Sequence, residues 1–328
     1  MQAMCLYECG QPLKLESRQM PDPAAEEVLI RVSACAVCRT DLHVVDGDLD
    51  PVVQPVVLGH EVVGHVEQLG REVRGLRVGQ RVGVPWLAGT CGACRYCLEG
   101  QENLCDSPEF TGYTRDGGFA THLLARAAFC LPLDSLPLDD IRAAPLMCAG
   151  LIGWRSLMMA GDASCLGLYG FGAAAHLVAQ VAIARGQQVF AFTRAGDESA
   201  QEHARSLGAT WAGASNEPAP LPLDAAIIFA PVGSLVPVAL KAVRKGGCVV
   251  CGGIHMSDIP SFRYERLWGE RQLRSVANLT RADGRAFLAQ VRHHPVQVDT
   301  TQYRLDQANE ALNDLRQGHL RGAAVLVP

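Results

Sequence analysis

The chain lacks several features that would assign it to whole classes of proteins. Its 328 residues contain no stretch close to the ~18 uninterrupted apolar residues of a membrane-spanning helix. It has no run of lysine and arginine, and its formal net charge of -5 excludes a general attraction to nucleic acid or acidic membranes. The first residues lack a basic segment followed by an apolar core, so we expect no signal peptide. These absences favour a cytoplasmic protein.

The composition is otherwise that of a globular protein, except for cysteine. Apolar residues make up 48% and charged residues 19%, and this length predicts two domains with separate cores. There are 13 cysteines, an odd number. Without a signal peptide, cysteines are more often metal ligands or buried thiols than disulfides.

The pattern of apolar residues changes near position 150. The earlier part is rich in Val, Gly and Pro, and it predicts short strands and turns compatible with a small barrel. Beyond it, strands are predicted at Ser164–Tyr169, Val189–Phe192, Ala225–Ala230, Cys248–Cys251 and 323–327, and helices at Ala173–Ala184, Leu235–Val243 and Leu305–Leu315. Strands that alternate with helices indicate a parallel sheet in an α/β domain.

Four cysteines lie within fifteen positions: Cys91, Cys94, Cys97 and Cys105. Tetrahedral zinc takes four soft ligands at about 2.3 Å, and a short loop with this spacing can wrap one ion. An iron–sulfur site and unligated thiols are the alternatives. Four protein ligands leave no open position, so the loop predicts a structural zinc.

A catalytic zinc needs three protein ligands and one open position. The candidates are Cys38 in Cys-Arg-Thr-Asp-x-x-His, His60 in Gly-His-Glu, and Cys148 in Pro-Leu-Met-Cys. Spacing alone does not bring these residues together. Taken singly, each is better explained as a buried thiol or a hydrogen-bonded histidine.

A glycine pattern in the second half is typical of a dinucleotide-binding turn. The segment Gly170-Phe-Gly172-Ala-Ala-Ala175 follows a predicted strand and opens a predicted helix, where the N-terminus would meet a pyrophosphate. Packing between strand and helix explains the glycines as well. The next strand ends in Thr193-Arg194 without a carboxylate, and a hydroxyl beside a guanidinium suits a 2′-phosphate. We therefore expect NADP(H) in preference to NAD(H), unless Asp197 or Glu198 reaches the ribose.

In this order, with the four-cysteine loop between the second and third candidate ligands, these segments resemble the zinc-dependent medium-chain alcohol dehydrogenases of bacterial type. The resemblance covers nearly the whole chain. It implies an α/β protein with a GroES-like β-rich catalytic domain at 1–150, which would hold both zinc sites. It further implies a Rossmann NAD(P)-binding domain with a doubly wound parallel sheet at 151–281, and a C-terminal segment, 282–328, that returns to the catalytic domain. A homodimer or homotetramer is also implied.

The same resemblance implies two zinc ions per chain, with Cys38, His60 and Cys148 holding the catalytic one. Cys38 is preferred to Cys35 because the Arg-Thr-Asp-x-x-His sequence follows it. Asp41 would orient the histidine ligand, and its alternative is a helix-start aspartate.

The family chemistry implies roles for three further residues. Zinc would favour the alkoxide of a bound alcohol, which gives hydride to NAD(P). Thr40 would contact the substrate oxygen and His43 would pass the proton outward. The alternatives are a helix cap for Thr40 and an exposed histidine for His43. Glu61 would lie behind the metal, or else be a buried, paired carboxylate.

By the same resemblance, the cofactor contacts would be Arg39, Gly170, Gly172, Ala173, Ala175, Thr193, Arg194, Gly252, Gly253, Ile254 and Arg321. Leu49 and Trp86 would line the alcohol pocket, unless they are simply core residues. The expected activity is reversible hydride transfer between a primary or secondary alcohol and NAD(P). The alternatives are a polyol or aromatic-alcohol dehydrogenase of the same superfamily, and a non-catalytic nucleotide- or zinc-binding relative.

Overall fold

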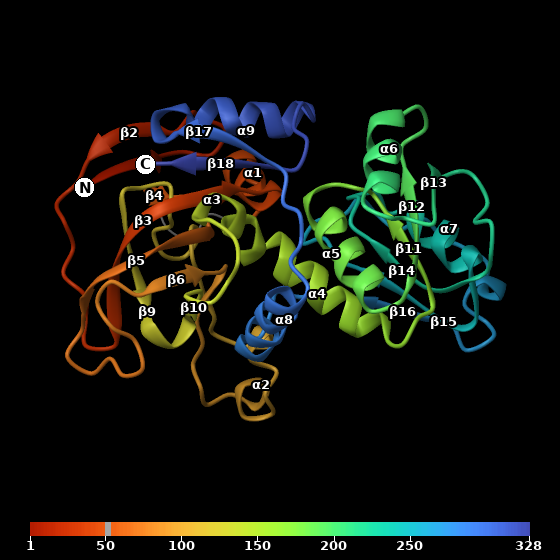
Figure 1. Ribbon diagram of the computed structural model, residues 1–328, viewed down its shortest axis with the longest axis horizontal. Helices are drawn as coiled ribbons and strands as arrows, with labels where there is room; N and C mark the ends of the chain where they lie inside the picture. The colour runs from red at the N-terminus through yellow and green to blue at the C-terminus, as the bar shows by residue number, and fades with distance from the viewer. Residues whose placement is uncertain (50–53) are drawn as a thin grey trace. The chain divides into compact units, whose positions relative to one another are not determined.

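The computed structural model describes residues 1–49 and 54–328, and it divides the chain into two units. One unit comprises Met1–Ala149 and Asn278–Pro328, and the other comprises Gly150–Ala277. The C-terminal residues therefore return to the unit in which the chain begins, and in Figure 1 the blue strands β17 and β18 lie beside the red N-terminal strands.

The first unit contains a seven-stranded sheet whose order is β10-β6-β5-β3-β18-β17, with β9 also paired to β3. Its strands are β3 (Glu27–Val37), β5 (Glu61–Leu69), β6 (Arg81–Val84), β9 (His122–Arg126), β10 (Leu131–Pro132), β17 (Thr300–Arg304) and β18 (Ala323–Val327). A three-stranded sheet, β2-β1-β4, comprises Lys14–Ser17, Gln2–Leu6 and Val56–Val57. A two-stranded sheet pairs β7 (Leu87–Gly89) with β8 (Glu109–Phe110).

Short helices connect these strands. They are α1 (Arg39–Asp46), α2 (Arg95–Leu98), α3 (Asp140–Ala143), α8 (Arg281–His293) and α9 (Ala308–Gln317). The core of the unit joins apolar side chains of β1, β3, β5 and β18 to one face of α9. The strand β3 reads Val-Leu-Ile-Arg-Val-Ser-Ala-Cys-Ala-Val after its first residue, and it is buried along most of its length. Such β-branched and apolar runs favour a central strand.

The second unit is a parallel six-stranded sheet with the order β13-β12-β11-β14-β15-β16. Its strands are β11 (Cys165–Tyr169), β12 (Gln188–Thr193), β13 (Trp211–Ala214), β14 (Leu223–Ile228), β15 (Val243–Cys251) and β16 (Gln272–Ser275). Its helices are α4 (Ala149–Ala160, of which Ala149 belongs to the first unit), α5 (Ala173–Ala184), α6 (Glu198–Ser206) and α7 (Leu235–Ala242). In chain order the strands run 3-2-1-4-5-6, the arrangement of dinucleotide-binding folds. The predicted α/β class with a doubly wound parallel sheet is confirmed.

The sequence pattern located buried elements better than exposed ones. The helix predicted at Ala173–Ala184 is α5 with the same bounds. The edge strand β16 was not predicted, because its residues Gln-Leu-Arg-Ser are all exposed and carry no apolar alternation. The predicted helix at Leu305–Leu315 begins with a 3₁₀ turn, Leu305–Gln307, and continues as α9.

Within the described residues no single helix has the length and hydropathy of a membrane span. Only the bent pair of segments Asp140–Met147 and Ala149–Ala160 reaches that length and hydropathy when the two are taken together.

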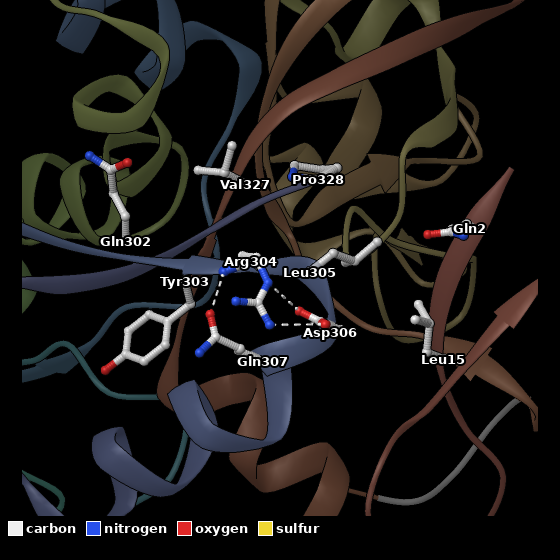
Figure 2. Close-up of a pocket in the computed structure, with 10 residues that line it drawn as sticks. All are labelled: Gln2, Leu15, Gln302, Tyr303, Arg304, Leu305, Asp306, Gln307, Val327 and Pro328. Atoms are coloured by element: carbon white, nitrogen blue, oxygen red, sulfur yellow. Dashed lines mark hydrogen bonds and ion pairs between the residues drawn. The ribbon is translucent and has the colours of Figure 1, made fainter.

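A groove of about 610 Å³ lies at the β17 edge of the first unit, where Arg304 pairs with Asp306 at 3.0 Å (Figure 2). None of the predicted zinc ligands lines this groove.

Candidate metal centres and cofactor turn

Cys38, His60 and Cys148 come together in the first unit, and Glu61 joins them. Their ligand atoms lie within 4.8 Å of one another, although Cys38 and Cys148 are 110 residues apart. The two thiol sulfurs are 3.9 Å apart. Cys35 is not in this group, and its Sγ instead donates to the carbonyl of Ala36 at 3.7 Å. Cys38 directly precedes α1, His60 directly precedes β5, and Cys148 directly precedes α4. The fold thus brings two thiols and one imidazole together from three separate segments.

His60 presents a nitrogen suited to a metal. Its Nδ1 lies 3.2 Å from Oδ1 of Asp41, and since a carboxylate only accepts, Nδ1 carries the proton. In the neutral ring, the form that ligates a metal, Nε2 then holds a lone pair, and this atom is buried without a hydrogen-bond partner in the described part of the chain. Leaving a buried polar atom unpaired is costly unless it ligates a metal. The donor set therefore fits zinc.

Asp41 makes both kinds of contact that the sequence left as alternatives. Its Oδ2 accepts a hydrogen bond from the main-chain N–H of Cys38 at 2.8 Å, which forms part of the capping box of α1. Its Oδ1 faces His60 and also accepts from the N–H of Gly59 at 3.2 Å. One buried carboxylate thus fixes two of the segments that carry candidate ligands.

The gathered donors change one another's protonation. The hydrogen bond from Cys148 lowers the pKa of Cys38 well below its ordinary value, and the same contact raises the pKa of Cys148. Burial by itself lowers the pKa of His60, but the charges of Asp41 and Cys38 and the hydrogen bonds to both residues together outweigh it and raise that pKa. Burial and then the charge of Cys38 raise the pKa of Glu61. Perturbations of this kind are typical of functional and metal sites.

Thr40 and His43 lie in α1 directly after the first candidate ligand. Thr40 is 7% exposed, and its Oγ1 lies 3.8 Å from Sγ of Cys38. The N-cap of the helix is Cys38, so the Thr40 hydroxyl does not cap it. The side chain of His43 is 15% exposed, and its Nδ1 lies 2.8 Å from Oδ2 of Asp48. The sequence analysis did not single out Asp48, although an acidic residue one position past a helix-ending glycine is a readable signal.

The four-cysteine loop forms a second group of donors within 4.8 Å of one another. Sγ of Cys91 lies 3.5 Å from that of Cys105 and 4.0 Å from that of Cys97. Main-chain N–H groups of Ala93 and Cys94 lower the pKa of Cys91 to about 6, whereas burial raises the pKa of Cys97 to about 11. Four thiols, with main-chain N–H groups directed at them, fit a closed zinc site.

Glu102, which the sequence analysis missed, ties this loop to the C-terminal segment. It is 8% exposed and accepts hydrogen bonds from Nη2 and Nε of Arg281 at 2.6 and 2.9 Å. It also accepts from the main-chain N–H of Arg281, at the start of α8, at 2.7 Å. The guanidinium of Arg281 lies over the ring of Phe129 at 4.7 Å. The partners are 179 residues apart, so no local pattern could reveal the pair.

The glycine turn of the second unit has the geometry that a pyrophosphate requires. Gly170 has φ +89°, and a Cβ there would lie 2.9 Å from the main-chain N of Ala230, so only glycine fits. Gly172 precedes α5 without a side-chain cap, and a Cβ there would enter open space. Ala173 is the first residue of α5, and Ala175 is fully buried. The N–H groups of this helix therefore remain open to an anion.

The end of β12 presents one positive side chain. Thr193 is 3% exposed, and its Oγ1 already accepts from Nε2 of Gln201 at 3.1 Å. Arg194 is exposed. Asp197 caps α6, and its Oδ1 accepts from the N–H of Ala200 at 3.2 Å. The hydroxyl of Thr193 and the carboxylate of Asp197 are thus both engaged locally.

The remaining predicted cofactor residues lie at varied positions. Gly252 follows β15, and a Cβ there would lie 3.0 Å from Oγ of Ser156 and 2.9 Å from the ring of Phe229. Gly253 and Ile254 come next, and Ile254 is 46% exposed.

Four other predicted residues belong to the first unit. Arg39 is exposed at the start of α1, and Nε of Arg321 lies 3.1 Å from Oδ2 of Asp299. Leu49 packs against the core of the unit. Trp86 lies beside the metal-ligand group, with its ring centroid 6.2 Å from that of His60.

Comparison with known proteins agrees with this architecture. Residues 24–135 match the alcohol dehydrogenase GroES-like domain family, which confirms the predicted catalytic domain type. The chain is 47% identical over 324 residues to a probable alcohol dehydrogenase, AdhA, of Mycobacterium tuberculosis (strain CDC 1551 / Oshkosh), covering 96% of this chain and 93% of that protein. It is 33% identical over 340 residues to an alcohol dehydrogenase of Moraxella sp. (strain TAE123), covering 99% of each.

Among solved structures, a cinnamyl alcohol dehydrogenase of Sorghum bicolor superimposes with a TM-score of 0.89 at 27% identity, covering 99% of this chain and 97% of that one. Fold and donor groups are those of a two-domain dehydrogenase with two candidate metal sites. The chain belongs to the zinc-dependent medium-chain alcohol dehydrogenases, a family of oxidoreductases.

Proposed function

We propose that the chain is a zinc-dependent, NAD(P)-linked alcohol dehydrogenase that transfers hydride reversibly between a primary or secondary alcohol and the nicotinamide. The observation that carries this proposal is the convergence of two thiols on a buried imidazole nitrogen that has no hydrogen-bond partner among the described residues. The hydroxyl of Thr40 beside this group argues against a non-catalytic relative, because a purely structural metal needs no proton path.

Each residue of the site has a proposed task. Cys38, His60 and Cys148 would hold a zinc ion, which when bound supplies Lewis acidity that lowers the pKa of an alcohol hydroxyl. Thr40 would hydrogen-bond the alcohol oxygen, and His43 would take the proton outward while Asp48 steadies its ring.

Two supporting carboxylates and a second metal complete the proposal. Asp41 would keep the His60 imidazole in the tautomer that ligates, and Glu61 would lie behind the metal. The four-cysteine loop would hold a second, structural zinc. None of the 13 cysteines, all of which lie within the described residues, forms a disulfide, which supports a reducing cytoplasm as the setting.

The activity and the metals can be measured together. Purified protein should contain two zinc ions per chain by mass spectrometry of the metal. It should also reduce NADP or NAD with a panel of alcohols, followed by absorbance of the reduced nicotinamide. Stoichiometric zinc without turnover on any alcohol or aldehyde would leave only the non-catalytic alternative.

We propose that NADP(H) is preferred because of Arg194. Thr193 and Asp197 are engaged locally, so recognition of a 2′-phosphate would depend on this exposed guanidinium. Replacing Arg194 with alanine is therefore expected to raise KM for NADPH roughly tenfold to a hundredfold, the effect of losing a charge-assisted hydrogen bond. KM for NADH should stay within about twofold. Steady-state kinetics with both cofactors test this, and a wild-type preference for NADH would contradict it.

We also propose a homodimer or homotetramer. The strand β16 ends the parallel sheet, and all its residues are exposed, with Leu273 at 37% and the nearby Trp268 at 61%. An unpaired edge with exposed apolar side chains is a template for pairing with another chain.

Light scattering during size exclusion tests the oligomer. The wild type should have at least twice the 35.1 kDa chain mass, and Leu273→Glu should shift it toward 35.1 kDa. Leu221→Glu is the matched control, since Leu221 is 50% exposed in the same unit and lies outside the sheet. A monomeric wild type refutes the proposal.

A further inference from the structure

A buried hydroxyl in the second unit has no hydrogen-bond partner. Ser156 lies in α4 and is 0% exposed. A serine within a helix commonly donates its hydroxyl to the main-chain carbonyl four residues earlier, which here is that of Ile152. Among the described residues, however, Oγ of Ser156 forms no hydrogen bond. A buried hydroxyl without a partner destabilises the folded state, so its presence calls for a reason other than core packing.

The hydroxyl of Ser156 lies against the end of strand β15. A Cβ on Gly252, the residue after this strand, would lie 3.0 Å from Oγ of Ser156. The same Cβ would lie 2.9 Å from the ring of Phe229, the residue after β14. One turn further along α4, the carbonyl of Met159 accepts from Sγ of Cys248 in β15 at 3.8 Å. The helix α4 thus packs along β15, and Ser156 contacts the strand's carboxyl end.

Gly252 lies at the same edge of the parallel sheet as the glycine turn. The strands β11, β14 and β15 are neighbours, and Gly170, Phe229 and Gly252 are the residues that follow them. A Cβ on Gly170 would lie 2.9 Å from the main-chain N of Ala230, so the loops after β11 and β14 are in contact. Ligands of such sheets bind beyond the carboxyl ends of the strands. Since Arg194 follows β12 on the other side of β11, the nicotinamide half of a dinucleotide would extend toward Gly252.

The segment that begins at Gly252 can change its main-chain path. The N–H of Gly252 donates to the carbonyl of Ile228 at 2.8 Å and continues the pairing of β15 with β14. Gly252 is buried and the following Gly253 is exposed, and glycines permit more backbone conformations than other residues. The segment is fixed again at Ser257, whose N–H donates to a carbonyl in the loop after β14 at 3.3 Å. A change of torsion angles between these two anchors can present a main-chain group to the Ser156 hydroxyl.

We propose that Ser156 is a positioning residue for the cofactor: its hydroxyl hydrogen-bonds the Gly252–Gly253 main chain when the nicotinamide half of NAD(P)H occupies this edge of the sheet. This inference rests on the proposed function. The unpaired hydroxyl gains a partner on binding, which adds to the affinity for the nicotinamide half. The groups that would hold the pyrophosphate and the adenosine belong to other strand ends and gain nothing from Ser156.

Replacing Ser156 with alanine separates two effects of the hydroxyl, because they have opposite signs. Without cofactor the variant loses an unpaired buried group, so its Tm should stay the same or rise by up to about 4 °C. Its Kd for NADPH or NADH, whichever the wild type binds more tightly, should rise about threefold to tenfold, the effect of one neutral hydrogen bond. Its Kd for the matching ADP-ribose, with or without the 2′-phosphate, should stay within about twofold because this fragment has no nicotinamide.

Scanning calorimetry measures Tm, and titration calorimetry measures each Kd without any turnover. Ser206→Ala is the matched control in the same unit, because the Ser206 hydroxyl already donates to the carbonyl of His203 at 2.7 Å. This control should not raise Tm, and it should leave both Kd values within about twofold of the wild type.

The outcomes distinguish this inference from the proposed function. If the wild type binds neither dinucleotide, both fail. If it binds one of them without oxidising any alcohol, only the proposed function fails. If Ser156→Ala binds the dinucleotide as tightly as the wild type, the function stands and the inference is overturned. An equal loss of affinity for the dinucleotide and the ADP-ribose fragment, or a Tm lower by more than about 4 °C, would make Ser156 only structural and would overturn the inference as well.

Discussion

Replacing Cys148 with alanine is expected to lower kcat by at least about a thousandfold, because the metal supplies several kcal/mol of charge stabilisation in the transition state. The variant loses one of the two sulfurs that lie 3.9 Å apart beside His60, so the zinc content should fall from two ions per chain to one. Metal analysis and steady-state turnover of the same preparation measure both effects.

Cys35→Ala is the matched control for this variant. Cys35 is also a fully buried thiol near the site, but its Sγ donates to a main-chain carbonyl and it is outside the group of metal donors. Its removal should leave two zinc ions and turnover within about threefold of the wild type. If the Cys35 variant lost the zinc and the Cys148 variant kept it, the assignment of ligands would be wrong.

Replacing Cys97 with alanine should chiefly affect stability. The four-cysteine loop has little core of its own: no residue of α2 is buried, Leu98 is 74% exposed and Leu104 is 40% exposed. The Glu102–Arg281 pair ties one end of the loop to the start of α8. Structural zinc contributes several kcal/mol or more to folding, so Tm should fall by roughly 10 °C or more. Scanning calorimetry with metal analysis measures this change.

The zinc content and the turnover of the Cys97→Ala variant distinguish the two metal sites. At a temperature well below its Tm, the Cys97 variant should retain one zinc and turnover within about fivefold of the wild type. Cys165→Ala is the control, because Cys165 is a partly exposed free thiol outside both groups, and its Tm should change by no more than about 2 °C. An unchanged Tm with two zinc ions in the Cys97 variant would refute the structural role of the loop.

Local patterns were enough for the features whose residues are close in the chain. The four cysteines between 91 and 105 form one donor group, and the glycine turn at 170–175 lies between β11 and α5. In both cases a few consecutive residues set the backbone path, so spacing alone carries the information. The parallel sheet was also predictable, because its buried strands read as apolar runs separated by helices.

Tertiary structure decided the features that depend on strand pairing between distant segments. It brought Cys38 to within 3.9 Å of Cys148, placed Glu102 against Arg281, and stacked Phe110 on Trp86. No periodicity encodes such contacts, because they form only when different segments of the chain pack together in the folded unit. The sequence could thus indicate a metal-dependent dehydrogenase. Only the fold shows which side chains surround the reacting groups, since that depends on side chains meeting across sheets.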